Sequence, residues 1–183
     1  MKKLFALLAL LPCLAWSAPV VDLVTNRGTI EIALDQAHAP KTVANFLAYV
    51  KSGHYNGTVF HRVISGFMIQ GGGFDTQLKE RPTRAPIANE ADNGLKNNVG
   101  TIAMARTPDP NSATAQFFIN VANNDALNFR SRTDDGWGYA VFGKVTRGMD
   151  VVMRIAQSQT GDYNGMSDVP QQPIIIIKAT VKN

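Results

Sequence analysis

Cysteine is almost absent from this sequence, with one residue, Cys13, among 183. It lies in "MKKLFALLALLPCLAWSA", where two lysines precede an apolar run and small residues follow. That layout is typical of a secretory signal peptide, and we expect cleavage after Ser17. The remaining residues 18–183 would then carry no thiol, which excludes disulfides and a cysteine nucleophile. Packing must stabilise such a fold.

A lipid-attached protein is the alternative interpretation of the N-terminal segment. Leu10-Leu11-Pro12-Cys13 loosely resembles a lipid-attachment box, although a proline directly before the cysteine argues against it. The apolar run is too short to span a bilayer, and no later segment is long and apolar enough. We therefore expect an exported protein with no membrane association once the signal is removed.

Charge of one sign and metal-binding patterns are also scarce. The formal charge is +4 and falls to +2 without Lys2 and Lys3, and no run of five basic residues occurs, so nucleic-acid binding is not expected. The three histidines, His38, His54 and His61, lie in separate segments without the spacing of metal ligands. The glycines of "QGGGF" do not introduce a helix, which excludes a phosphate-binding loop. We expect neither metal nor cofactor.

Short β-rich segments dominate the rest of the chain. A hairpin is predicted over 20–34, turning at Asn26-Arg27-Gly28. Further strands are expected at 59–64, 67–70, 100–105, 116–120, 140–145 and 173–181, with the longest loop from about Asp75 to Asn98. About eight strands favour a mainly β fold, a closed eight-stranded antiparallel β-barrel in one domain over 18–183, because closure removes exposed strand edges.

Two amphipathic helices are expected to cap this barrel. In "PKTVANFLAYVKSG" (40–53) the residues Val43, Phe46, Leu47 and Val50 follow helical spacing, with a proline near the start and a glycine past the end. The second helix is predicted at 149–157. Its apolar stripe would consist of Met149, Val152, Met153 and Ala156.

The segment "FHRVISGFMIQGG" (60–72) places a permanent cation, Arg62, in an apolar strand. Alternation puts Phe60, Arg62 and Ile64 on one face and Val59, His61 and Val63 on the other. By periodicity alone, the arginine stem packs while its head reaches water or a carboxylate. The same reasoning makes Phe67, Met68 and Phe118 core residues, and Gln70 and Gln116 partners of loose backbone groups.

Five blocks of the chain change that interpretation. "FHRVISGFMIQGGGF", "NEADNGL", "GTIAMAR", "SATAQFFIN" and "YAVFGKV" resemble, in order, the signature blocks of the cyclophilin-type peptidyl-prolyl cis-trans isomerases. The resemblance covers about residues 20–181, and the stretch between Gly73 and Gly100 is similar to the bacterial secreted branch. It implies a cofactor-free isomerase in the periplasm that accelerates X-Pro rotation while exported proteins fold.

The resemblance also implies a role for each matching residue. Arg62 would be the catalytic cation, and Gln70 would orient it and touch the substrate backbone. Phe67, Met68, Phe118 and Leu127 would hold the proline ring, Ala105 would contact the backbone before the proline, and Gln116 would line the neighbouring groove. Tyr139 stands where many relatives carry histidine, and His61 is counted with the substrate-binding residues.

Two positions depart from the family pattern. Ala126 stands where strongly cyclosporin-binding members have tryptophan, so weak or no cyclosporin binding is expected. Arg106 stands where asparagine is usual. It either favours acidic residues ahead of the proline or is a solvated surface charge.

Three functions remain open at this point. The first is the isomerase, a monomer acting on proline-containing polypeptides. The second is a non-catalytic proline-peptide binding module or holdase chaperone of the same fold. The third, a barrel that encloses a small ligand, is disfavoured because large apolar residues on both sides of the strands leave little lumen.

Overall fold

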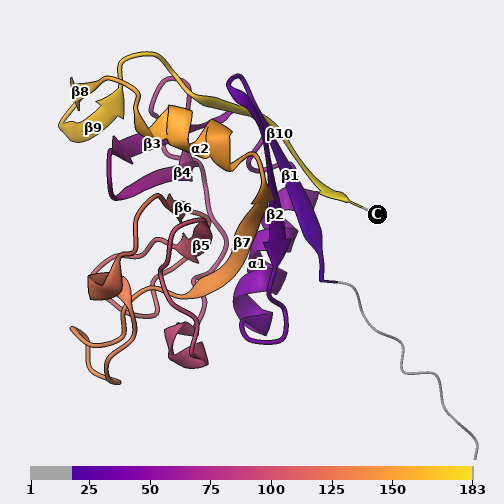
Figure 1. The fold of residues 1–183 in the computed structure, drawn as a ribbon, viewed down its shortest axis with the longest axis vertical. Helices are drawn as coiled ribbons and strands as arrows, with labels where there is room; N and C mark the ends of the chain where they lie inside the picture. The colour runs from indigo at the N-terminus through magenta and orange to yellow at the C-terminus, as the bar shows by residue number, and fades with distance from the viewer. Residues whose placement is uncertain (1–17, 183) are drawn as a thin grey trace, which may run out of the picture.

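The computed structural model describes residues 18–182, and eight of the strands in this range close into a barrel (Figure 1). Neighbours around the barrel follow the order β1-β10-β3-β4-β6-β5-β7-β2, and every pair is antiparallel. The predicted fold class is therefore confirmed. The strands are β1 (Val20–Thr25), β2 (Gly28–Leu34), β3 (Thr58–Ile64), β4 (Met68–Asp75), β5 (Thr101–Met104), β6 (Phe117–Asn120), β7 (Val141–Arg147) and β10 (Ile175–Lys182).

Helix α1 (Pro40–Lys51) packs its buried face on the barrel core. Its Phe46 ring lies 5.6 Å from Phe117 and 5.1 Å from Phe142, centroid to centroid. The first turn has no acidic residue, and Glu90 from the long loop supplies the missing acceptor. Its carboxylate accepts hydrogen bonds from the backbone N–H groups of Lys41 (3.1 Å) and Thr42 (2.8 Å). This cap fastens the loop to the helix.

Helix α2 (Met149–Ala156) carries an apolar stripe that matches the predicted one at Met149, Val152 and Ala156 but not at Met153. Val151, Val152, Ile155 and Ala156 are buried, whereas Met153 is 39% exposed. Val151 and Ile155 also pack on the barrel core, in place of Met153. The helix itself was predicted at nearly its observed bounds.

Large side chains fill the barrel lumen. The fully buried set joins residues from both helices and most strands, including Leu23, Ile30, Ile32, Phe46, Phe60, Ile69, Ile102, Phe117 and Phe142. Interiors this dense resemble organic crystals, with no room for a guest molecule. A ligand inside the barrel is therefore not supported.

The predicted alternation along β3 is wrong between Phe60 and Arg62. Phe60 pairs with Gly71 and Arg62 with Gln70, so two steps on β3 oppose one on β4. Such a bulge bends the strand and resets which side chains face inward. Phe60 enters the core while Arg62 is half-exposed. Gly71 permits the close approach, because a Cβ there would lie 3.0 Å from the Val59 carbonyl oxygen.

The second sheet was not predicted at all. Strands β8 (Thr160–Tyr163) and β9 (Met166–Pro170) form a separate two-stranded sheet that lies against β3 (Figure 1). Its turn residues, Asn164 and Gly165, both have positive φ (50° and 80°), as a two-residue hairpin turn of type I′ requires.

Candidate active site

Strand register lines up the predicted site residues across the outer face of the barrel. Arg62 on β3 pairs with Gln70 on β4, which pairs with Phe118 on β6, which pairs with Ala103 on β5. Adjacent strands lie about 4.8 Å apart, so the arginine and the phenylalanine are separated by about 10 Å at the backbone. Side chains of both therefore border the same cavity, across the intervening glutamine.

A second apolar cluster lies on this outer face, apart from the core. Met68, Ala103, Phe118 and Val141 are its buried members, and Phe67, Leu127 and Tyr139 pack against it. Above it is a cavity of about 190 Å³. That volume is below the range of drug-sized pockets and suits one small ring. Its lining consists of Arg62, Phe67, Met68, Gln70, Ala105, Arg106, Phe118, Leu127 and Tyr139.

The Arg62 guanidinium borders this cavity with its donors unused. Within residues 18–182 the group makes no hydrogen bond to the protein, and its one ionic contact is from Nε to Oδ2 of Asp168, at 3.5 Å. The side chain is 43% exposed, so its charge is accessible. A guanidinium carries five N–H donors and stays protonated, which makes it a fixed hydrogen-bond donor beside an apolar slot.

Gln70 points its amide at Gln116 and not at the guanidinium. Its Nε2 donates to Oε1 of Gln116 at 3.0 Å, and no hydrogen bond joins it to Arg62 in the described chain. Gln116 itself lies outside the cavity lining. Gly73 makes its position possible, because a Cβ at that glycine would come within 2.5 Å of the Gln116 side chain. The glycine cluster after Gln70 thus serves packing.

Arg106 lines the cavity together with Tyr139. Its guanidinium donates to the backbone carbonyls of Gly138 (2.9 Å), Thr107 (2.9 Å) and Pro108 (3.1 Å) and lies 4.8 Å above the Tyr139 ring. The Tyr139 ring in turn meets Phe118 edge-on at 5.6 Å. Most donors of Arg106 are therefore occupied within the protein, while its charge still borders the cavity.

Asparagine side chains hold the loops that bring Phe67 and Leu127 to the cavity. Asn97 donates to the Leu127 carbonyl at 3.1 Å, and Asn124 donates to the Phe67 carbonyl at 2.9 Å. Asn120 joins these two, since it donates to Asn97 at 3.2 Å and accepts from Asn124 at 2.7 Å. Two non-adjacent loops are thereby fixed to each other.

The structure does not bring His61 to this cavity. The side chain is 6% exposed and its ring lies 4.6 Å from Phe74, on a different side of β3 from Arg62. Burial, aided by the charge of Arg62, lowers the pKa of His61 from 6.5 to about 4. Its Nδ1 atom is buried with no hydrogen-bond partner, so this histidine is a neutral packing residue near neutral pH.

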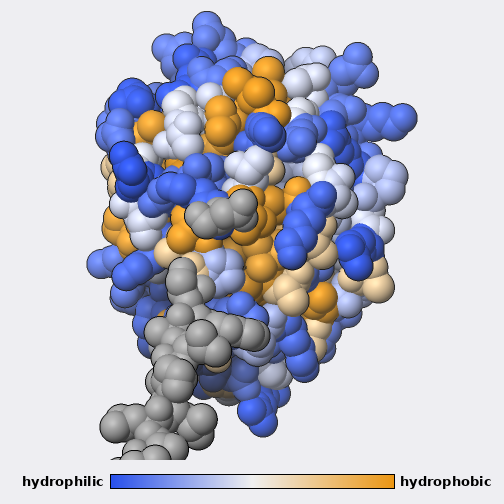
Figure 2. Space-filling model, turned by 90° about the vertical axis from the view of Figure 1, so that its right-hand side faces the viewer, coloured by the Kyte–Doolittle hydropathy of each residue, from blue (hydrophilic) through white to orange (hydrophobic). Residues whose placement is uncertain are grey.

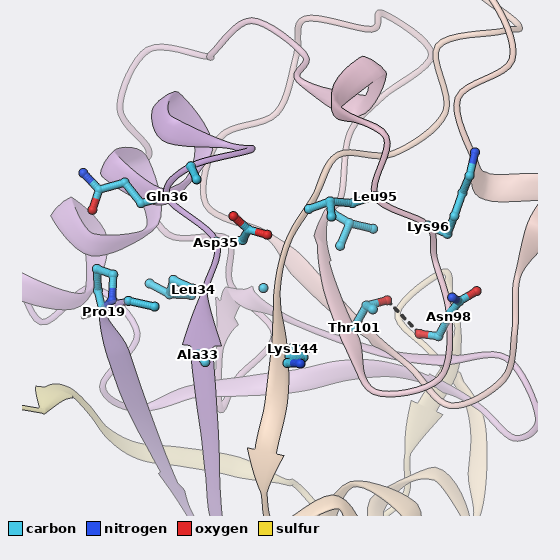
Figure 3. Close-up of a pocket in the computed structure, with 14 residues that line it drawn as sticks. Pro19, Ala33, Leu34, Asp35, Gln36, Leu95, Lys96, Asn98, Thr101 and Lys144 are labelled. Carbon is cyan, nitrogen blue, oxygen red and sulfur yellow. Dashed lines mark hydrogen bonds between the residues drawn. The ribbon is translucent and has the colours of Figure 1, made fainter. Parts of the chain in front are cut away.

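A larger cavity, of about 770 Å³, lies elsewhere and is not the predicted site. Figure 2 shows apolar residues gathered in the middle of the side on which β1 and β10 lie in Figure 1. Figure 3 shows the cavity between the ends of β2 and β7 and the segment 95–101, where Thr101 donates to the Asn98 carbonyl (2.7 Å). Its charged lining residues are Asp35, Lys96 and Lys144, and no ion pair joins any two of them in the described chain.

Two features of the site were missed by sequence reasoning. Asp168 belongs to the unpredicted hairpin, although "YNGM" carries an Asn-Gly pair, the strongest short hairpin signal. The asparagine network has no comparable signal, because the residues are scattered over 97–128. No group of three or more described His, Asp or Glu side chains is arranged to hold a metal, and no described helix is long and apolar enough to cross a membrane.

The comparisons with known proteins agree with this geometry. Residues 20–181 match the sequence model of the family "Cyclophilin type peptidyl-prolyl cis-trans isomerase/CLD". Peptidyl-prolyl cis-trans isomerase cyp18 of Streptomyces antibioticus is 61% identical over 161 residues, covering 88% of this chain and 97% of the relative. Peptidyl-prolyl cis-trans isomerase B of Escherichia coli is 55% identical over 162 residues, covering 88% and 99%.

A solved structure is similar as well. A cyclophilin-type isomerase of Cryptosporidium parvum, crystallised in the presence of the dipeptide Ala-Pro, has a TM-score of 0.73 and 29% identity, with 90% of this chain and 99% of that chain covered. The chain belongs to the cyclophilin-type peptidyl-prolyl cis-trans isomerase family. The family predicted from the sequence blocks is confirmed.

Proposed function

We propose that the protein catalyses cis–trans rotation of X-Pro bonds in polypeptides, with Arg62 as the catalytic cation. One observation carries the proposal: a guanidinium with unused donors borders a small cavity walled by Phe67, Met68 and Phe118. The relatives named as isomerases, and the neighbour crystallised with Ala-Pro, support the same substrate class.

The proposed chemistry needs no bond to break. Rotation about a peptide bond has a barrier of about 18–20 kcal/mol because delocalisation of the nitrogen lone pair keeps the group planar. As the bond twists, the nitrogen regains its lone pair and becomes a good hydrogen-bond acceptor. A guanidinium beside that nitrogen binds the twisted state better than either planar state, and such differential binding lowers the barrier.

Arg62 accounts for part of the acceleration. One charge-assisted hydrogen bond contributes about 1.5–3 kcal/mol, and 1.36 kcal/mol corresponds to about one decade in rate. The arginine therefore supplies roughly one to two decades. The apolar walls would supply more, because a dry slot penalises the charge-separated planar amide relative to the twisted one. In this account Gln70, Gln116 and Ala105 hold the chain on either side of the ring.

We further propose that the enzyme acts on proteins folding in the periplasm. The support is the signal-like segment at residues 1–17, which lies outside the described residues. Sequencing the N-terminus of protein recovered from the periplasm should give Ala18 first. Recovery of the uncleaved chain from the cytoplasm would rule out this location.

A binding module without turnover is the competing function, because Ala126 leaves one side of the cavity without an aromatic wall. A coupled assay of X-Pro isomerisation on residues 18–183 separates the two. We expect catalytic acceleration at sub-stoichiometric enzyme. Saturable binding of the peptide with no acceleration would establish the binding module instead.

A further inference from the structure

Asp168 lies on β9, in the hairpin that packs beside β3, and pairs with the cation of the proposed site. Oδ2 of the aspartate is 3.5 Å from Nε of Arg62, and the two side chains are 39% and 43% exposed. In the described range, the Asp168 carboxylate accepts no hydrogen bond from the protein. The ion pair is thus the one polar contact of this side chain there.

The backbone at Asp168 has an unusual conformation. Its φ is 62°, and it lies in an irregular stretch where Gly161 pairs with Val169 but Tyr163 pairs with Met166, so β9 has one residue more than β8. Bulges of this kind with a left-handed residue usually place glycine there, and they redirect a neighbouring side chain. Aspartate tolerates the left-handed region better than most residues, but glycine occupies it without steric cost.

Stability gives little reason for a carboxylate at this position. An ion pair between half-exposed side chains contributes little, because solvent screens it, while a left-handed non-glycine residue carries a conformational cost. Residues held in strained conformations cluster at functional sites. The charge at Asp168 is therefore better explained by what it does to Arg62 than by folding.

We propose that Asp168 is a positioning residue that holds the Nε edge of Arg62, so that the remaining N–H groups stay directed to the substrate nitrogen. The inference rests on the proposed function of Arg62. Gln70 does not fill this role in the described chain, because no hydrogen bond joins it to Arg62 and its Nε2 donates to Gln116 instead. Holding the guanidinium before the substrate arrives lowers the cost of ordering it in the transition state.

The test compares Asp168→Asn and Asp168→Gly with wild type in the X-Pro assay on residues 18–183. Asparagine keeps the shape and tolerates the backbone, whereas glycine relaxes the backbone entirely. We expect both variants to lower kcat three- to tenfold with KM unchanged, and Asp168→Glu to recover part of the loss. The urea midpoint of Asp168→Gly should equal or exceed that of wild type. Asp162→Asn, an exposed charge in the same hairpin, should leave kcat unchanged.

Double variants show whether Asp168 affects the isomerisation rate by acting on Arg62. In an Arg62→Ala background, assayed at higher enzyme concentration, Asp168→Asn should change nothing further. An equal loss in that background, or an unchanged or faster rate for Asp168→Asn alone, would overturn the inference. If Arg62→Ala alone does not lower the isomerisation rate, it is the proposed function of Arg62 that fails, because Asp168 can act through Arg62 only if Arg62 contributes to the rate.

Discussion

Arg62 and Gln70 lie directly opposite each other on β3 and β4, yet the glutamine amide donates to Gln116, at 3.0 Å, and the arginine pairs with Asp168. The two residues therefore belong to separate polar pairs that meet at one cavity. In the proposed function the glutamine pair would line the groove before the proline, and the ion pair would position the cation.

The Gln70→Leu variant tests whether the glutamine pair acts separately from the Arg62–Asp168 pair. Removing the amide leaves Gln116 without its partner but keeps the Arg62–Asp168 pair, so we expect KM for an X-Pro peptide to rise severalfold while kcat falls less. Gln36→Leu, an exposed glutamine in another part of the fold, serves as the control for the substitution itself. A fall confined to kcat would indicate that Gln70 acts on the cation after all.

Asn97→Ala tests the network that fixes the loops. Asn97 is fully buried, and its side chain joins Leu127, Asn120 and Asn128. Partners left unsatisfied in a buried site cost about 1–3 kcal/mol, so the free energy of unfolding in urea should fall by about that amount. Asn98→Ala, next in the chain but exposed, should stay within about 0.5 kcal/mol of wild type. Equal effects of the two variants would contradict a structural role for the network.

The burial of His61 predicts that the free energy of unfolding depends on pH. Burial, aided by the charge of Arg62, lowers its pKa from 6.5 to about 4 in the folded state. The unfolded chain then binds a proton between these values while the folded chain does not, so stability falls as pH drops below 6.5. From pH 7 to 5 the contribution lost is about 2 kcal/mol, at 1.36 kcal/mol per pH unit.

His61→Phe should remove this component from urea unfolding measured at both pH values. Stability also falls when Glu31 and Asp75 are protonated, because hydrogen bonds lower their pKa values, but that loss comes below their ordinary values of 4.5 and 3.8. The partly buried His54, whose pKa burial also lowers, remains in both proteins and cancels in the difference. An unchanged slope in His61→Phe would show that His61 ionises normally.

Ala126→Trp tests the open side of the cavity. Ala126 is exposed, directly before Leu127 in the short 3-10 helix η2 (Asp125–Leu127). An aromatic side chain there would cover the open side of the cavity. Its apolar contact with a bound ligand would contribute about 1.5–3 kcal/mol to the binding free energy. We expect cyclosporin affinity, measured by calorimetry, to rise roughly ten- to a hundredfold. Tight binding by wild type already, with no gain in the variant, would contradict the assigned role of Ala126.

The sequence predicted most of the barrel, because each strand carries β-branched or aromatic residues between glycine, asparagine and proline turns. It could not place Phe60 and Arg62 correctly relative to each other, since the bulge depends on how closely Gly71 lets the next strand approach. Nor could it show that the Arg106 guanidinium donates hydrogen bonds to the backbone carbonyls of Gly138 and Thr107, because only the fold brings these groups together. Asp168 is remote from Arg62 in the chain and joins it only through the packing of β9 on β3.

The most direct measurement is the isomerisation rate of Arg62→Ala on an X-Pro peptide, beside Arg62→Lys and a surface control, Arg154→Ala. The Arg62 side chain is half-exposed, so its removal should leave the fold and the urea midpoint intact. We predict a rate at least tenfold below wild type for Arg62→Ala, an intermediate rate for Arg62→Lys, and an unchanged rate for Arg154→Ala. A folded Arg62→Ala variant as fast as wild type would contradict the account.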